Sequence, residues 1–226
     1  MGIVQNKVAI ITGAGSGLGK AAALGFAREG AIVVLCGRRM HKIAEVERQI
    51  TEAGGRALAV RTDVSDEAEV SRLIGTVLDR FGTVDILLNN AAVCELASLT
   101  ETSLQSWEYQ FSVNVTGPFL MMKACLPIMR KHNYGRIVNI TSGLSHNGAG
   151  GYAAYGASKA ALESLTRAAA DEEESYDILI NMYNPGMIRS EMHATGKDPE
   201  VVVPDLLHLV SLPRKGLSGR LLEAAR

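Results

Sequence analysis

The chain alternates short, almost continuously apolar runs with longer segments of helical periodicity. Six such runs, rich in valine and isoleucine, occupy residues 7–12, 31–36, 56–63, 84–90, 136–142 and 177–184. A strand that is apolar on both faces is typical of a parallel sheet covered by helices on both sides. The repeated strand–helix order therefore predicts an α/β protein with a doubly wound parallel sheet.

The segments between the runs carry the apolar stripe of amphipathic helices. Between residues 67 and 82 one such stripe ends at Gly82, and it consists of Val70, Leu73, Ile74, Val77 and Leu78. After the last run we expect a helix, a turn and a short final strand near residues 219–224. The sequence has no linker or repeat, and 226 residues fit one ordinary domain. We predict a single domain spanning residues 1–226.

Composition excludes several classes of partner. The chain has 23 basic and 24 acidic residues, so its charge offers no reason to expect nucleic acid or an anionic membrane. We also expect no signal peptide and no segment that spans a bilayer. The three cysteines are scattered, and neither they nor the histidines show metal-ligand spacing. These features predict a reduced, cytoplasmic protein without a metal site.

A glycine-rich turn, TGAGSGLG at residues 12–19, follows the first run directly. Glycines at a strand-to-helix junction permit a tight turn and allow a pyrophosphate to approach the helix N-terminus. Its position at the start of a strand–helix–strand unit favours a Rossmann-type dinucleotide site over a turn with packing duties only. A Walker-type loop is excluded, because Ala21 follows Lys20 where Ser or Thr is required.

The end of the second run, VVLCGRR, bears on the choice of dinucleotide. An NAD-binding domain usually places an acidic residue here to bind the ribose 2′-hydroxyl. Gly37 stands at that position, and Arg38 and Arg39 follow it. Guanidinium groups without a neighbouring carboxylate favour a 2′-phosphate. We predict NADP(H) as the cofactor, with NAD(H) as the second candidate; the competing interpretation of the arginines is a solvated helix start.

Tyr155 and Lys159 are candidates for proton chemistry. They are four residues apart in a segment that reads as helix, so both side chains share one face, whereas Tyr152 has only Gly156 at that spacing. A nearby ammonium is expected to lower the phenol pKa from its ordinary value of about 10. Ser142 ends a buried-looking strand, where open α/β sheets bind ligands. The competing interpretations are surface helix residues and a cap serine.

The motifs together resemble the short-chain dehydrogenase/reductase family, including its 3-oxoacyl-carrier-protein reductases. The matching residues occur in the family's order between residue 7 and about residue 190: TGAGSGLG (12–19), Asp63, NNAA (89–92), Asn114, Ser142, YGASK (155–159) and NPGMIRS (184–190). The resemblance implies that Tyr155 is the catalytic acid and base and that Ser142 polarises the carbonyl. It also implies that Lys159 holds the nicotinamide ribose and lowers the pKa of Tyr155, and that Asn114 supports a proton-relaying water chain.

The same resemblance implies the residues that bind the dinucleotide. Asp63 would meet the adenine ring, and the strand end NPGMIRS would seat the nicotinamide carboxamide. The full set of expected cofactor-binding residues is Gly13, Ser16, Gly17, Leu18, Gly19, Arg38, Arg39, Asp63, Val64, Asn90, Ala91, Tyr155, Lys159, Pro185, Gly186, Ile188 and Ser190.

Some positions depart from the family's pattern. Ala92 replaces the more usual glycine, and Ser190 stands where threonine is commoner. The segment after Ser190 is brief, which predicts an open substrate pocket or a small lid. Mixed, mostly apolar residues are expected to line that pocket: Cys94, Leu144, His146, Met187, Met192 and His193.

These observations lead to a predicted function and to alternatives. We expect an NADP(H)-dependent oxidoreductase that interconverts a small-molecule carbonyl and a secondary alcohol through Asn114, Ser142, Tyr155 and Lys159. The alternatives are a non-catalytic dinucleotide-binding redox sensor or regulatory subunit, and a structural partner that has lost activity. The resemblance also implies a homodimer or homotetramer that packs through residues 102–130 and 153–173.

Overall fold

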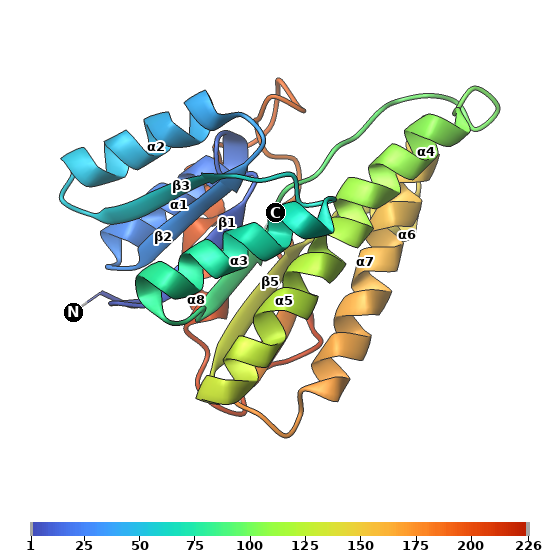
Figure 1. Ribbon diagram of the computed structural model, residues 1–226. Helices are drawn as coiled ribbons and strands as arrows, with labels where there is room; N and C mark the ends of the chain where they lie inside the picture. The colour runs from blue at the N-terminus through green and yellow to red at the C-terminus, as the bar shows by residue number, and fades with distance from the viewer. Residues whose placement is uncertain (1, 225–226) are drawn as a thin grey trace.

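A seven-stranded sheet, in the order β3-β2-β1-β4-β5-β6-β7, runs through the centre of the computed structural model (Figure 1), which describes residues 2–224. Every neighbouring pair of strands is parallel. The strands are β1 (Val8–Thr12), β2 (Ile32–Gly37), β3 (Arg56–Arg61), β4 (Ile86–Asn89), β5 (Gly135–Ile140), β6 (Ile178–Asn184) and β7 (Leu221–Glu223). The predicted doubly wound, Rossmann-type sheet in a single domain is confirmed.

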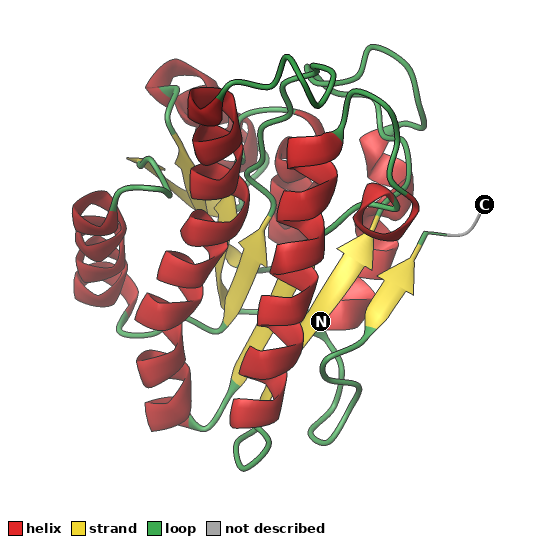
Figure 2. Ribbon diagram, turned by 90° about the vertical axis from the view of Figure 1, so that its right-hand side faces the viewer, coloured by secondary structure: helices red, strands yellow, loops and turns green. Residues whose placement is uncertain are grey.

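Helices cover both faces of this sheet, as Figure 2 shows from the side. One apolar cluster joins one face to α1, α2 and α8, and a second joins the other face to α3, α5 and α7. The helices are α1 (Gly17–Arg28), α2 (Met40–Glu52), α3 (Glu67–Phe81), α4 (Leu104–Phe111), α5 (Gly117–His132), α6 (Leu144–Asn147), α7 (Ala153–Glu172) and α8 (Val203–Val210). A π-helical turn, η1 (Ser112–Thr116), joins α4 to α5, and a 3-10 turn, η2 (Pro199–Val202), precedes α8.

The apolar runs form strands whose two faces are both covered by helices. All residues of β1 and β5 are buried, which accounts for their continuous hydrophobicity. β3 is an edge strand whose two terminal arginines are exposed. It ends at Arg61 rather than at residue 63 as predicted, and Asp63 instead accepts hydrogen bonds from Ser65 in the turn that follows. β7 pairs with β6 close to the position predicted for the last strand.

Helix α3 shows how the sequence sets the ends and the buried face of one layer. The Asp66 side chain accepts a hydrogen bond from the Glu69 backbone N–H at the start, and Gly82 ends the helix in the left-handed conformation (φ 74°). Four residues of the predicted stripe are buried, and Leu78 is partly buried against the same cluster. The predicted helix and its face are confirmed.

The helical run Leu104–His132 differs from the sequence expectation. By length and apolar composition it meets the criteria for a membrane span, although no such segment was predicted. This is weak support for a membrane helix, because core helices pass the same test. In the structure the run is α4, η1 and α5, and it packs on α3, α7 and the sheet. Its hydrophobicity therefore has an explanation within the core.

A substitution at Gly25 tests the packing of α1 on α8. A Cβ at Gly25 would lie 2.4 Å from Val203 Cγ1, so Gly25→Ala should lower the free energy of unfolding by about 1–2 kcal/mol despite alanine's better helix propensity. Gly75 on α3 has open space around it, and Gly75→Ala should raise the free energy of unfolding by about 0.5–1 kcal/mol. Urea denaturation of both variants measures the difference. Equal effects at the two sites would contradict the described packing.

Candidate active site

The glycine-rich turn forms one wall of a cleft at the carboxyl ends of the strands. Gly13 and Gly17 have positive φ values of 67° and 50°. A Cβ at Gly13 would lie 2.8 Å from Asn90 Nδ2, and a Cβ at Gly17 would lie 2.9 Å from Ser190 Cβ. Neither position therefore accepts a side chain. The Ser16 hydroxyl makes no cap bond to α1. The first backbone N–H groups of α1 are therefore not occupied by this side chain. This helix start suits an anionic group of a ligand.

Hydrogen bonds join the strand ends on the two sides of this turn. Thr12 Oγ1 accepts bonds from the backbone N–H groups of Asn90 and Ala91, both at 3.0 Å. Asn90 Nδ2 donates to the Thr12 carbonyl oxygen at 2.9 Å. The bonds hold β1 against the chain that leaves β4, at the point where the strand order reverses. This is where open α/β sheets bind ligands.

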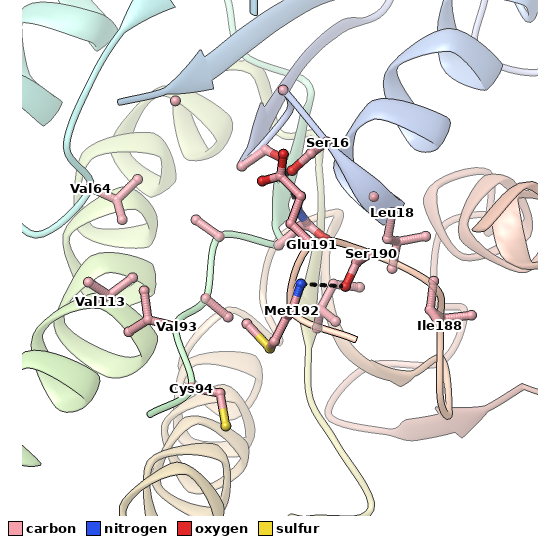
Figure 3. Close-up of a pocket in the computed structure, with 18 of the residues that line it drawn as sticks. Ser16, Leu18, Val64, Val93, Cys94, Val113, Ile188, Ser190, Glu191 and Met192 are labelled. Atoms are coloured by element: carbon pink, nitrogen blue, oxygen red, sulfur yellow. Dashed lines mark hydrogen bonds between the residues drawn. The ribbon is translucent and has the colours of Figure 1, made fainter. Parts of the chain in front are cut away.

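The cleft has a volume of about 590 Å³ and collects nearly all of the residues predicted to bind a dinucleotide. Gly19 is the exception, because it lies beneath the cleft; a Cβ there would meet the Gly13 carbonyl oxygen at 2.3 Å. The predicted residues that line the cleft are Gly13, Ser16, Gly17, Leu18, Arg38, Arg39, Asp63, Val64, Asn90, Ala91, Tyr155, Lys159, Pro185, Gly186, Ile188 and Ser190. Figure 3 shows this cleft, with Ser16 and Leu18 on the side of the glycine-rich turn.

The two arginines after β2 face different partners. Arg38 Nη1 donates to the Tyr109 hydroxyl at 2.9 Å and lies 3.9 Å from Asp63 Oδ2. Arg39 Nη2 instead donates to Glu191 Oε2 at 2.6 Å. Both line the cleft, but they do not form the single fork that the adjacent arginines suggested.

Tyr155, Ser142 and Lys159 meet at the opposite end of the cleft. Tyr155 and Lys159 lie one turn apart on α7, and Ser142 follows β5. Tyr155 and Ser142 both line this part of the cleft, and the Ser142 hydroxyl is close enough to the Tyr155 phenol to affect its pKa. Lys159 is 2% exposed, and its ammonium donates to the Ile140 carbonyl oxygen at 2.9 Å and lies 5.6 Å from the centroid of the Tyr155 ring. The cleft lining includes these three residues but not Tyr152.

Burial dominates the ionisation of this group. Burial raises the pKa of Tyr155 to about 12, with Cys94 also raising it and the Ser142 hydrogen bond opposing the shift. Burial likewise lowers the pKa of Lys159 to about 8. The net shift of the Tyr155 pKa is therefore upward, opposite to the expected lowering, because removing the phenol from water disfavours its anion more than the surroundings favour it.

Asn114 lies in the π-helical turn η1, a type of distortion that is frequent at functional sites. Its amide group pairs with the backbone of Val93, at 2.8 Å to the N–H and 2.9 Å to the carbonyl oxygen. Its Nδ2 also donates to Ser158 Oγ at 3.0 Å. Asn114 thus joins the chain after β4 to α7 beside Lys159, outside the cleft lining. The proton-relaying water chain stays a prediction.

Glu163 is a buried carboxylate that the sequence analysis missed. It accepts hydrogen bonds from Thr141 Oγ1 at 2.7 Å and from Ser145 Oγ at 2.6 Å, on either side of Ser142. Burial raises its pKa, but these bonds, together with His146 and Arg167, outweigh that effect and hold the pKa below its ordinary value. The available signal was its spacing, since Glu163 continues on α7 the face of Tyr155 and Lys159.

The expected substrate pocket is only partly assembled from the predicted residues. Cys94, Leu144, Met192 and His193 line the cleft. Met187 is 64% exposed, and His146 Nδ1 contacts Ser145 Oγ at 2.9 Å; neither is part of the lining. Ser190 Oγ accepts bonds from the backbone N–H groups of Met192 and His193, both at 3.2 Å, as Figure 3 shows for Met192. The brief segment after β6 is therefore organised locally.

Comparisons with known proteins agree with this geometry. Residues 7–200 match the model of the short chain dehydrogenase family. The chain is 38% identical over 187 residues to a 3-oxoacyl-[acyl-carrier-protein] reductase from Synechocystis sp.. The aligned region covers 82% of this chain and 76% of the relative. It is 39% identical over 188 residues to a meso-2,3-butanediol dehydrogenase from Serratia marcescens, covering 83% and 74% of the two chains.

A solved structure shares the whole architecture. It is a metagenomic short-chain oxidoreductase in complex with NADP, with a TM-score of 0.90 and 30% identity, covering 99% of this chain and all (100%) of that one. The family match, the two relatives and the arrangement of the glycine-rich turn with Ser142, Tyr155 and Lys159 lead to one assignment. This chain belongs to the short chain dehydrogenase family of oxidoreductases.

Proposed function

We propose that the protein is an NADP(H)-dependent oxidoreductase that interconverts a carbonyl and a secondary alcohol. The observation that carries this proposal is that the hydroxyl side chains of Ser142 and Tyr155 line one cleft with the glycine-rich turn. Two hydroxyl donors beside a dinucleotide-sized cleft suit the transfer of a proton to a carbonyl oxygen. A non-catalytic sensor would need no such pair.

The residues present fit a nicotinamide dinucleotide. The turn at Gly13–Gly17 packs too closely on Asn90 and Ser190 to carry side chains, and the first turn of α1 offers backbone donors to a pyrophosphate. Asp63, two residues after β3, lies beside Arg38 and would border the adenosine. The lack of an acidic residue at Gly37 and the cations that follow it support NADP(H) over NAD(H). The NADP complex of the structural neighbour supports the same choice.

The chain's own residues would orient the substrate and move a proton. When bound, the nicotinamide supplies or accepts a hydride. Ser142 would donate a hydrogen bond to the carbonyl oxygen, and Tyr155 would give that oxygen its proton. Because the pKa of Tyr155 is about 12, the phenol already holds this proton at neutral pH. In the direction of alcohol oxidation Tyr155 would accept the proton instead.

Two further properties remain predictions. The first is a homodimer or homotetramer that packs through α4, α5 and α7; the exposure of Leu104 on α4 and Phe119 on α5 supports such an interface. The second is the cytoplasmic location. The substrate is a small carbonyl compound or alcohol, and the names of the two relatives span an acyl-carrier-protein-bound ketone and a diol.

Replacing one hydroxyl tests the catalytic assignment. Tyr155→Phe should reduce turnover of NADPH with a panel of ketones by about 10²–10⁴-fold, because the proton donor is lost. Coenzyme binding, measured by fluorescence titration, should remain. Tyr152→Phe is the matched control, since Tyr152 lies on the same segment but outside the cleft lining. Comparable activity of the two variants would contradict the role of Tyr155, and NADPH binding without turnover of any ketone by the unaltered protein would favour a sensor.

The high pKa of Tyr155 predicts opposite pH behaviour in the two directions. Alcohol oxidation needs the deprotonated phenol, so below a pKa of about 12 its kcat/KM should rise by about tenfold per pH unit between pH 7 and 9. Ketone reduction uses the protonated phenol and should gain nothing over that range. Initial rates in both directions, in buffers of constant ionic strength, measure this. An oxidation rate that is already level at pH 7 would mean that Lys159 does lower the phenol pKa in the working enzyme.

Arginine 38 tests the preference for a 2′-phosphate. Arg38→Ala should weaken NADPH binding by about tenfold, because a charge-assisted hydrogen bond is lost, and should leave NADH binding within about twofold. Arg28→Ala is the control, since Arg28 ends α1 and pairs with Glu200 away from the cleft. Dissociation constants from fluorescence titration provide the comparison. Equal losses for both coenzymes would favour the solvated helix start.

A further inference from the structure

The segment after β6 reaches across the cleft to the cations that follow β2. The Glu191 carboxylate accepts a hydrogen bond from Arg39 Nη2 at 2.6 Å and a second from Lys42 Nζ. All three residues line the cleft. In Figure 3 Glu191 lies beside Ser16, at the side of the cleft where the glycine-rich turn begins α1. The ion pair therefore lies on the side of the cleft that is formed by the glycine-rich turn and the end of β2.

The Glu191 carboxylate pairs with the same two cations that would bind the 2′-phosphate of a coenzyme. Arg39 follows Gly37 and Arg38 at the end of β2, where the adenosine ribose of a dinucleotide binds in a sheet of this topology. A 2′-phosphate would seek the guanidinium of Arg39 and the ammonium of Lys42. Glu191 already supplies an anion to both.

Glu191 carries its charge under all ordinary conditions. Its hydrogen bonds to Arg39 and Lys42 lower its pKa to about 2. The ion pair is also accessible to solvent, with side-chain exposures of 47% for Glu191 and 51% for Arg39. Exposed ion pairs are weak, so a ligand of higher charge can displace one partner. A phosphate of charge about −2 that bound to Arg39 and Lys42 would repel the Glu191 carboxylate beside it, so the carboxylate would have to move away.

We propose that Glu191 is a specificity-determining residue that competes with the coenzyme 2′-phosphate for Arg39 and Lys42. The inference rests on the proposed dinucleotide-dependent function. Binding of NADP(H) requires the Glu191 ion pair to open, whereas NAD(H), with a 2′-hydroxyl, leaves it closed. Glu191 therefore lowers the preference for NADP(H) that the arginines provide.

Direct binding to three proteins tests this role. NADPH and NADH are titrated into the unaltered protein, Glu191→Gln and Glu200→Gln, and the change in coenzyme fluorescence gives each dissociation constant. Glu200→Gln is the matched control, because it removes the same charge from another exposed ion pair, with Arg28, away from the cleft. Glu191→Gln should tighten NADPH by about threefold to tenfold and change NADH by less than about twofold. Glu200→Gln should change neither.

The salt dependence of coenzyme binding provides a second measurement that does not require enzymatic turnover. The gain of Glu191→Gln for NADPH should shrink as ionic strength rises from about 0.05 to 0.5 M, because the competition is between exposed charges. Equal tightening of both coenzymes, no change, or weaker NADPH binding would overturn the specificity role. If the unaltered protein binds neither dinucleotide, the proposed function itself fails. If it binds both and Glu191→Gln alters neither, only the role of Glu191 fails.

Discussion

The hydroxyl of Thr12 joins the end of β1 to the chain leaving β4, and the functional cleft depends on this contact. It accepts the backbone N–H groups of Asn90 and Ala91 at the point where the sheet reverses its strand order. From here α1 crosses to one face of the sheet, and the chain beyond β4 leads to the other. A parallel sheet that is buried on both faces forces this divergence. The glycine-rich turn and the Ser142 loop both open into the cleft above these strand ends.

Burial, more than charge spacing, sets the chemistry at the far end of the cleft. The fold removes Tyr155 and Lys159 from water together, which favours a neutral phenol and brings the amine pKa to about 8. The surrounding hydrogen bonds then determine orientation: Lys159 is held by Ile140, and Glu163 fixes the residues on both sides of Ser142. Donors positioned in this way need little reorganisation when charge develops on a substrate oxygen.

Much of the fold and part of the site were predictable from the sequence. Continuous apolar runs identified the strands, and motif positions identified most of the residues that line the cleft. What failed were contacts between distant segments. Residue order placed Arg38 and Arg39 side by side but did not indicate that one faces Tyr109 and the other Glu191. The spacing of Tyr155 and Lys159 indicated proximity but not desolvation, and the expected direction of the pKa shift was therefore wrong.

The brief segment between β6 and η2 has consequences at both ends of the cleft. Ser190 organises its turn, Glu191 reaches the cations after β2, and Met192 and His193 also line the cleft. Glu191 and Met192 are adjacent in the chain, so this one turn provides both the anion that pairs with Arg39 and Lys42 and an apolar part of the cleft lining.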